Sequence, residues 1–172
     1  MTALWKAKRV DNNEWVKGYL WVGADLMLII PYNYGVDYSS LEHKMKAVAY
    51  EVKPDTVCKN TNILDKHYNT IYEGDVLQYP NNEDDDLVCR SVVRIGKYTQ
   101  DGSGGEYKGR TCVGVYVSVL DFDCPEWAKD KDYWFPEHLK EENLQEVASK
   151  CVIIGNIFDN PELLGGNGNG KL

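Results

Sequence analysis

Stretches of alternating apolar and polar residues recur along the chain, and clusters of turn-forming residues separate them. The strongest alternation lies in residues 87–98 and 109–122, where successive side chains of a strand would point to opposite faces of a sheet. In the second stretch one face would carry Val113, Val115, Val117 and Val119, and the other Cys112, Gly114, Tyr116 and Ser118. The glycine-rich segment TQDGSGGE, residues 99–106, lies between the two stretches. The pattern therefore predicts one long antiparallel hairpin.

The first third of the chain shows the same kind of pattern in shorter pieces. Residues 4–10 and 15–22 are strand-like, and the four turn formers DNNE lie between them. A third strand is expected over residues 26–31, which end in a proline, and a fourth over residues 46–52, where apolar positions alternate. We predict an antiparallel β-meander at the N-terminus.

The remaining segments are less regular. Residues 53–70 show little periodicity and many turn formers, so we expect an ordered connector there. Short strands are expected over residues 76–79, 132–136 and 151–158. One helix is expected over residues 136–148, because a proline stands at its first turn and glutamates follow it. Since strands and helices do not alternate, we predict a mainly-β fold with antiparallel sheets and one short helix.

Charge is distributed unevenly along the chain. Residues 1–70 contain 9 Lys/Arg and 8 Asp/Glu, a net charge of +1, whereas residues 71–172 contain 10 and 19, a net charge of −9. An acidic surface repels a phosphate backbone, so the second part of the chain is a poor candidate for binding nucleic acid.

The cysteines and histidines do not form a recognisable metal site. The chain has an odd number of cysteines and no C-x-x-C pair: Cys58, Cys89, Cys112, Cys124 and Cys151. We expect reduced thiols in an intracellular protein. The three histidines, His43, His67 and His138, lack the spacing of zinc ligands. No metal and no cofactor is therefore expected.

The sequence also predicts where the protein is found. Its first residues, MTALWKAKRV, contain no apolar core of a signal peptide. The longest apolar run, Leu26–Ile30, is far too short to cross a bilayer. We expect a soluble protein that stays in the cytoplasm of the cell that makes it.

Three stretches resemble one known family. TNILDKHYNTIYEGDVL, residues 61–77, is similar to the central motif of the YopX family of phage and prophage proteins, in which I-Y-E-G-D precedes apolar residues. VIIGNIFDNPELL, residues 152–164, resembles the C-terminal signature of the family, and residues 5–22 resemble its opening hairpin. Two positions depart from the central motif, since Asn62 and Tyr68 stand where the motif has glycine. Asn62 tolerates a left-handed backbone, whereas Tyr68 does not tolerate one readily, so we expect the turn near Tyr68 to take another form.

The resemblance implies a phage-borne protein of a bacterial host with an SH3-like β-barrel in its C-terminal part. It supplies no catalytic residue, because the family is defined by sequence without an assigned activity. We therefore expect an N-terminal meander over residues 1–56, a YopX-like barrel domain with its connector over residues 57–164, and a flexible tail over residues 165–172.

The two motifs have a structural and a chemical interpretation. In the first, Gly74 permits positive φ, and Asp75 can accept backbone N–H groups at a corner where Tyr72 and Glu73 precede a strand. The alternative is a catalytic or metal site at Glu73 and Asp75, although no further acid or histidine lies nearby. In the second motif the turn-forming residues are Gly155, Asn156, Asn160 and Pro161. We favour structural roles for both motifs, with docking of a partner as the alternative for the second.

Two segments are candidates for binding. The loop PYNYGVDYSS carries Tyr32, Tyr34 and Tyr38 among Ser, Asn and Gly, a composition typical of recognition surfaces. The first hairpin combines basic and aromatic residues that could bind nucleic acid: Lys6, Lys8, Arg9 and Lys17, with Trp5, Trp15 and Trp21.

These observations favour one function over two others. We expect a non-enzymatic accessory module that binds a protein, either a host or phage factor or a second copy of itself. Nucleic-acid binding through the first hairpin is the alternative. An enzyme would need an enclosed pocket with a perturbed acid or thiol, and the sequence offers no Ser-His-Asp or Cys-His arrangement for one.

Overall fold

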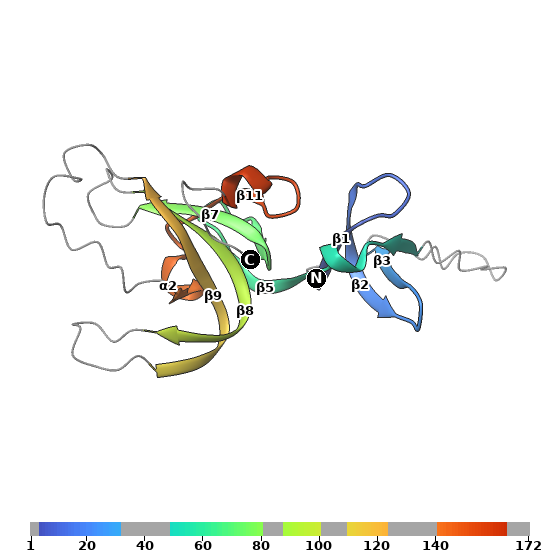
Figure 1. Cartoon of the computed structure of the whole chain (residues 1–172), viewed down its shortest axis with the longest axis horizontal. Coiled ribbons are helices and arrows are strands. Elements are labelled where there is room, and N and C mark those ends of the chain that lie inside the picture. The colour runs from blue at the N-terminus through green and yellow to red at the C-terminus, as the bar shows by residue number, and fades with distance from the viewer. Residues whose placement is uncertain (1–3, 32–48, 81–87, 101–109, 124–140, 165–172) are drawn as a thin grey trace, which may run out of the picture. The chain divides into compact units, whose positions relative to one another are not determined.

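A computed structural model describes residues 4–31, 49–80, 88–100, 110–123 and 141–164 (Figure 1). The chain divides into two compact units, Met1–Asn60 and Thr61–Leu172, and each is considered by itself. Strands dominate both units, and every strand pairing whose register is defined is antiparallel. The predicted mainly-β class is confirmed.

The N-terminal unit is a meander of four strands. They run in the order β4-β3-β2-β1 across the sheet. Their bounds are Trp5–Lys8 for β1, Trp15–Val22 for β2, Met27–Pro31 for β3 and Tyr50–Val52 for β4. The hairpin predicted for the first two strands is present, and Asn13 in its turn has a φ of 64°.

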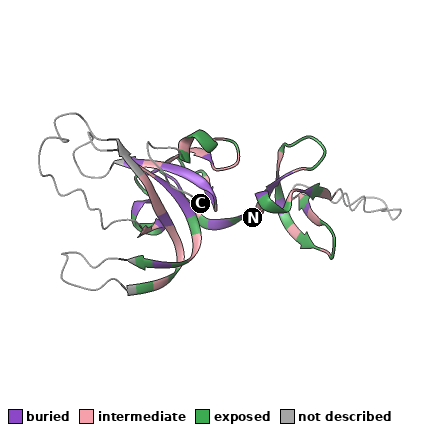
Figure 2. Ribbon diagram, in the orientation of Figure 1, coloured by how far each residue is buried: buried purple, intermediate pink, exposed green. Residues whose placement is uncertain are grey.

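Hydrogen bonds also join the end of β1 to β4. Arg9 forms a β-bridge with Val52, and the Val10 N–H donates to the carbonyl of Glu51 over 3.0 Å. The sheet therefore curls around a small core of buried side chains, Ala7, Val16, Ile29 and Val52. These four come from four different strands or strand ends, so the core depends on the whole meander. Figure 2 shows that buried residues occur along the strands of both units.

The predicted connector over residues 53–70 contains a strand, so that prediction was wrong in this part. A 3-10 turn, Pro54–Thr56, leads into β5, Cys58–Leu64, whose first residues pair with β1. In the C-terminal unit β5 continues beside β6, Thr70–Tyr72. Apolar alternation fails in β5 because its buried positions include polar residues, Asn60 and Thr61. Thr61 satisfies its hydroxyl group by donating to the carbonyl of Ile71 over 2.8 Å.

A five-stranded sheet forms most of the C-terminal unit. Its strand order is β10-β9-β8-β7-β11. The strands are β7, Asp75–Pro80; β8, Val88–Gln100; β9, Arg110–Asp123; β10, Glu141–Asn143; and β11, Val152–Asn156. β8 and β9 form the predicted long hairpin, and both bend along their length (Figure 1). Among the described residues no pairing joins β10 to β11, so the SH3-like barrel stays a prediction.

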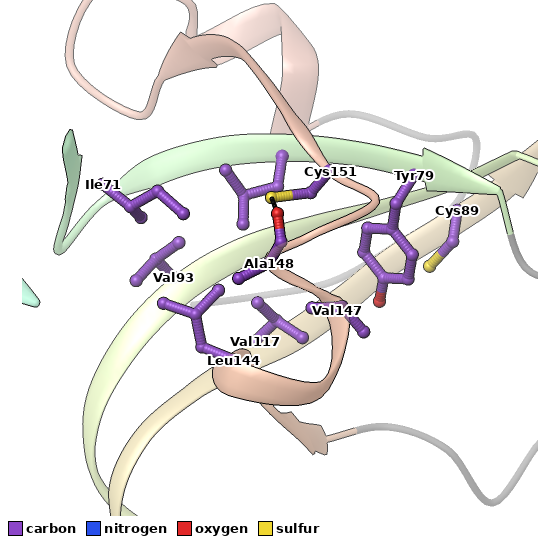
Figure 3. Close-up of a cluster of buried hydrophobic side chains, with 10 residues drawn as sticks. Ile71, Tyr79, Cys89, Val93, Val117, Leu144, Val147, Ala148 and Cys151 are labelled. Carbon is purple, nitrogen blue, oxygen red and sulfur yellow. Dashed lines mark hydrogen bonds between the residues drawn. The ribbon is translucent and has the colours of Figure 1, made fainter. Parts of the chain in front are cut away.

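The core of this unit lies between the sheet and a short helix. Leu144 and Val147 of the helix point toward Val93 and Val117 of the long hairpin (Figure 3). Leu144, Val93 and Val117 are fully buried. Each such side chain contributes about 1.5–3 kcal/mol by leaving water, so this cluster is the main source of stability in the unit.

The helix is shorter than predicted. Residues 136–140 of the predicted helix lie outside the described part of the chain; of residues 141–148, Glu141–Asn143 form strand β10 and helix α2 comprises Leu144–Val147. The Asn143 side chain caps α2 by accepting from the Gln145 N–H over 2.9 Å. The two preceding glutamates lie in the strand because β10 pairs with β9, a tertiary pairing that outweighs local helix preference. In the described part of the chain, no helix has the length and apolar character needed to cross a membrane.

Candidate functional site

The first motif forms a tight corner at the start of β7. Gly74 has a φ of 82°, a left-handed conformation that favours glycine, and its N–H donates to the carbonyl of Val93 over 2.9 Å. Asp75 is buried, and its Oδ2 accepts from the backbone N–H of Tyr72 over 2.8 Å. Burial raises the pKa of the Tyr72 hydroxyl group, and the charge of Asp75 adds to the effect.

The second motif completes the same corner. Asn156 lies opposite Asp75 in the ladder between β11 and β7, and its Nδ2 donates to Asp75 Oδ1 over 2.9 Å. The Ile157 N–H donates to the carbonyl of Gly74 over 3.0 Å. The two motifs, separated by about eighty residues of sequence, therefore build one structure, which we call the motif corner: residues 72–75 with residues 155–164.

The rest of the second motif folds back over β11. Asn156 Oδ1 accepts from the Phe158 N–H over 3.0 Å, and Pro161 begins a 3-10 turn, Pro161–Leu164. A Cβ added at Gly155 would lie 2.6 Å from Asn160 Oδ1 and 2.7 Å from Leu163 Cδ1. Only glycine leaves room for this turn. Close packing therefore accounts for Gly155, and no ligand is needed to explain it.

The motif corner has the chemistry of a structural site. Both carboxylate oxygens of Asp75 accept hydrogen bonds from within the chain, and Glu73 is only half-buried. The part of the chain that the structure describes contains no group of three or more His, Cys, Asp or Glu residues able to hold a metal. The corner therefore joins the start of β7 to the end of β11.

A second buried carboxylate organises the turn between β5 and β6. Asp65 Oδ1 accepts from the N–H groups of His67 and Asn69 over 2.9 and 2.8 Å. Its Oδ2 accepts from the Asn69 side chain over 3.1 Å and from the Ile153 N–H over 3.4 Å. Burial by itself would raise the pKa of Asp65, but these hydrogen bonds outweigh it and hold the pKa below its ordinary value.

The prediction that the turn near Tyr68 avoids the left-handed conformation is wrong. Tyr68 has a φ of 64°, so it adopts the left-handed conformation, as Asn62 does with a φ of 60°. For a bulky L-residue this conformation costs about 1–2 kcal/mol. The hydrogen bonds of Asp65 fix the turn firmly enough to hold Tyr68 there.

A polar cluster lies inside the C-terminal core. The hydroxyl groups of Tyr79 and Ser91 are 3.1 Å apart, and the Tyr79 hydroxyl donates to Glu142 Oε2 over 3.3 Å. Burial raises the pKa of Tyr79 and of Glu142, and the hydrogen bond from Tyr79 only partly opposes it at Glu142. Tyr79 and Ser91 are buried, whereas Glu142 is half-buried.

Within the described residues no disulfide joins the cysteines, which are Cys58, Cys89, Cys112 and Cys151. Burial, followed by the charge of Asp65, raises the pKa of Cys151 to about 11. Its Sγ donates to the carbonyl of Ala148 over 3.3 Å (Figure 3). A thiol with such a high pKa is a poor nucleophile at neutral pH.

The N-terminal unit has an accessible face on the side of its sheet opposite the core. The register places Lys6 opposite Lys17. It also places Lys8 opposite Trp15 on the same face. Further along β2 and β3 this face carries Tyr19, Trp21, Leu28 and Ile30. We call these eight residues the outer face.

The outer face combines exposed rings with positive charge. Tyr19 and Trp21 are 43% and 50% exposed. The ammonium groups of Lys6 and Lys8 lie 5.0 and 5.6 Å from the centroid of the Trp15 ring, which is within range of a cation–π interaction. The face therefore offers apolar area at one end and Lys6 and Lys17 at the other, whereas Lys8 is buried beside Trp15.

Two residues expected on this face lie elsewhere. Trp5 packs against the core, because it alternates with Lys6 along β1. Arg9 also follows the core side, where its guanidinium lies 3.9 Å from the centroid of the Tyr50 ring and bonds to Asp11. The predicted basic and aromatic hairpin is therefore only partly assembled. The contribution of β3 through Ile30 was not foreseen.

The tyrosine loop cannot be compared with this face. Tyr32, Tyr34 and Tyr38 lie outside the residues that the structure describes. Their role in binding stays a prediction.

The fold and the motif corner define a mainly-β protein in which two distant sequence motifs close one corner of an antiparallel sheet. The chain belongs to the YopX family, because the model of that family, described as YopX protein, matches residues 11–165. The matched range includes both motifs and every described strand except β1. No curated protein matches the chain.

Proposed function

We propose that this YopX-family protein is a non-enzymatic accessory module that binds another protein through its outer face. The observation that supports the proposal is the exposure of Tyr19 and Trp21 on one face of β2, away from the core. Tyr and Trp are enriched among the residues that dominate binding energy at protein interfaces. About half of each side chain is exposed, and this area can be buried against a partner.

The lysines indicate the character of the partner. Lys6 and Lys17 lie opposite each other at one end of the outer face, and Ile30 extends its apolar end. The matching surface would carry an apolar centre with carboxylates beside it. Under the proposal the partner is a host or phage protein in the bacterial cytoplasm, or the acidic second half of another copy of this chain. We also propose that the C-terminal strands belong to an SH3-like barrel.

A capture experiment distinguishes a protein partner from a nucleic acid. The tagged full chain is incubated with an extract of the cells that make it, with and without nuclease. Recovered material is identified by mass spectrometry and ultraviolet absorbance. We expect a protein that is retained after nuclease treatment, whereas recovery that depends entirely on intact nucleic acid would contradict the proposal.

Single-stranded nucleic acid is the second candidate. Trp15, Lys17, Tyr19 and Trp21 alternate along one strand, so neighbours in this row are about 7 Å apart. Rings that stack bases, with cations beside them for phosphates, form the usual single-strand surface. The net charge of −8 opposes this binding, and for that reason we rank it second.

Fluorescence anisotropy of a labelled oligo-dT tests the second candidate directly. Binding at low salt that weakens steeply as salt is added would support it, because phosphate contacts release counterions. An unchanged anisotropy at low salt would remove it and leave the protein partner as the remaining proposal.

A further inference from the structure

Gly23 leaves the space in which the ring of Trp21 lies. A Cβ added at Gly23 would be 2.6 Å from both Cη2 and Cζ3 of Trp21, which is closer than such atoms approach each other in proteins. The far end of the indole ring therefore rests on the backbone of Gly23. Exposure agrees with this contact, because Gly23 is half-buried although its chain neighbours, Val22 and Ala24, are exposed.

The backbone itself does not require glycine at this position. Gly23 is not among the described glycines with positive φ, which are Gly74 and Gly96, so other residues can adopt its conformation. Its N–H donates to the Leu26 carbonyl over 2.9 Å in the turn between β2 and β3, a bond that any residue except proline can form. An added Cβ would lie 3.3 Å from the Leu26 oxygen, which asks for a much smaller adjustment than the ring does. The ring of Trp21 is therefore the main obstacle to a side chain here.

We propose that Gly23 is a positioning residue of the outer face, which lets the Trp21 ring lie in one pose for a protein partner. The proposal rests on the proposed function and adds a residue to that site. Trp21 is 50% exposed, so part of the ring can contact a partner while its far end rests on Gly23. A ring that is already held loses less conformational entropy on binding than a mobile one. Because Trp often dominates the binding energy of an interface, its pose has a large effect on affinity.

The contact also determines how far the outer face extends. Val22 and Met27 form the last pair of the ladder between β2 and β3, and Trp21 lies opposite Leu28 just before it. Because its ring reaches Gly23, Trp21 carries the apolar end of the outer face past this last pair and onto the turn. A side chain at position 23 would lift the ring off the turn and change the shape of that end.

NMR of the full chain tests the contact without a partner. In wild type we expect nuclear Overhauser effects between the Gly23 Hα protons and the Hη2 and Hζ3 protons of Trp21. We also expect a ring-current shift of the Gly23 Hα protons that disappears in Trp21→Ala. Absence of both effects in wild type would overturn the proposal, whatever the chain binds.

A double-mutant cycle tests the effect on binding. Wild type, Trp21→Ala, Gly23→Ala and the double variant are each shown to be folded by urea unfolding. Each is then used to capture proteins from a nuclease-treated extract of the cells that make the chain. We expect Gly23→Ala to recover about three- to tenfold less of the retained protein than wild type, because a displaced ring must be ordered on binding. In the Trp21→Ala background the same substitution should change the recovery little, since Gly23 acts through the ring.

The outcomes separate the role of Gly23 from that of the outer face. Equal recovery by Trp21→Ala and wild type, or no specific recovery by wild type, would contradict the outer face as a binding surface and the role of Gly23 with it. If Trp21→Ala lowers the recovery but Gly23→Ala does not, the outer face stands and the role of Gly23 is overturned. An equal loss from Gly23→Ala with and without the Trp21 ring would assign the effect to the turn and would also overturn it.

Discussion

Two buried carboxylates of the C-terminal unit are used in the same way. Asp65 and Asp75 each accept a backbone N–H from a nearby turn and a further donor from the C-terminal segment, which is Ile153 for Asp65 and Asn156 for Asp75. A buried charge is tolerated when several hydrogen bonds satisfy it. The two acids therefore tie distant segments together, and this role accounts for Asp65 and Asp75 in the central motif.

Replacing Asp65 with Asn should destabilise the fold in a pH-dependent manner. Hydrogen bonds hold the folded pKa of Asp65 below its ordinary value of 3.8, so ionised Asp65 stabilises the folded state above that pH. At pH 7 we expect Asp65→Asn to lower the free energy of unfolding by about 2 kcal/mol, because donors to a charged acceptor lose part of their bonding. The deficit, measured by urea unfolding, should shrink as the pH falls from 3.8 through the lowered pKa. An equal deficit at pH 7 and pH 3 would be inconsistent with this role.

Glu142 should show the opposite sign. Burial raises its folded pKa above the ordinary 4.5, so the folded state favours the protonated form. Its contribution to stability is present below pH 4.5 and is lost as the pH rises through the raised pKa. Glu142→Gln, which keeps an acceptor for Tyr79 without the charge, should therefore unfold at higher urea than wild type at pH 7 and at the same urea below pH 4.5. Glu141→Gln on the same strand is the matched control, and an equal gain there would show that only net charge matters.

At the level of the elements, the sequence predicts a strand well where one face is apolar. Both strands of the long hairpin, β8 and β9, and the N-terminal meander alternate visibly, and the structure contains them. The sequence pattern does not reveal β5, because Thr61 takes a buried position that an apolar residue usually fills and satisfies its hydroxyl group with a hydrogen bond. The prediction extended the helix too far, because Glu141–Asn143 form β10 by pairing with β9. A local sequence pattern does not show this pairing.

The candidate sites were predictable to different degrees. The corner role of Gly74 and Asp75 follows from local turn chemistry, but the partner of Asp75, Asn156, depends on how β11 pairs with β7. The outer face depends in the same way on cross-strand register, which places Ile30 beside Tyr19. Sequence spacing alone had assigned Arg9 to that face, whereas the structure places it over Tyr50.

Gly155 offers a test of the second motif. An added methyl group would meet Asn160 and Leu163 at under 3 Å, so the 3-10 turn over β11 must shift. We expect Gly155→Ala to lower the free energy of unfolding by about 1–3 kcal/mol, the usual cost of overpacking. The control is Gly114→Ala, because a Cβ there would lie 4.0 Å from its nearest neighbour, Tyr98 Cε1. Equal urea midpoints for the two variants would contradict the close packing of the motif.

Across the whole molecule, charge and exposed rings are divided between two units. The lysines of the outer face belong to the first unit, whereas most of the negative charge lies in the sequence of the second. Each unit has its own core cluster; outside that core the first unit exposes Tyr19 and Trp21, and the second exposes Tyr68. Binding through the first unit can therefore be altered without touching the core of the second.

The most direct test of the outer face compares the full chain with a Tyr19→Ala/Trp21→Ala double variant in the nuclease-treated capture. Val22→Ala is the control, since Val22 is 58% exposed on the same strand but points to the opposite face. If these rings contribute about 2 kcal/mol or more to binding, the double variant should recover at least tenfold less of the retained protein while its urea unfolding transition shows that it is still folded. Equal recovery by the double variant, the control and wild type would show that the outer face is not the binding surface.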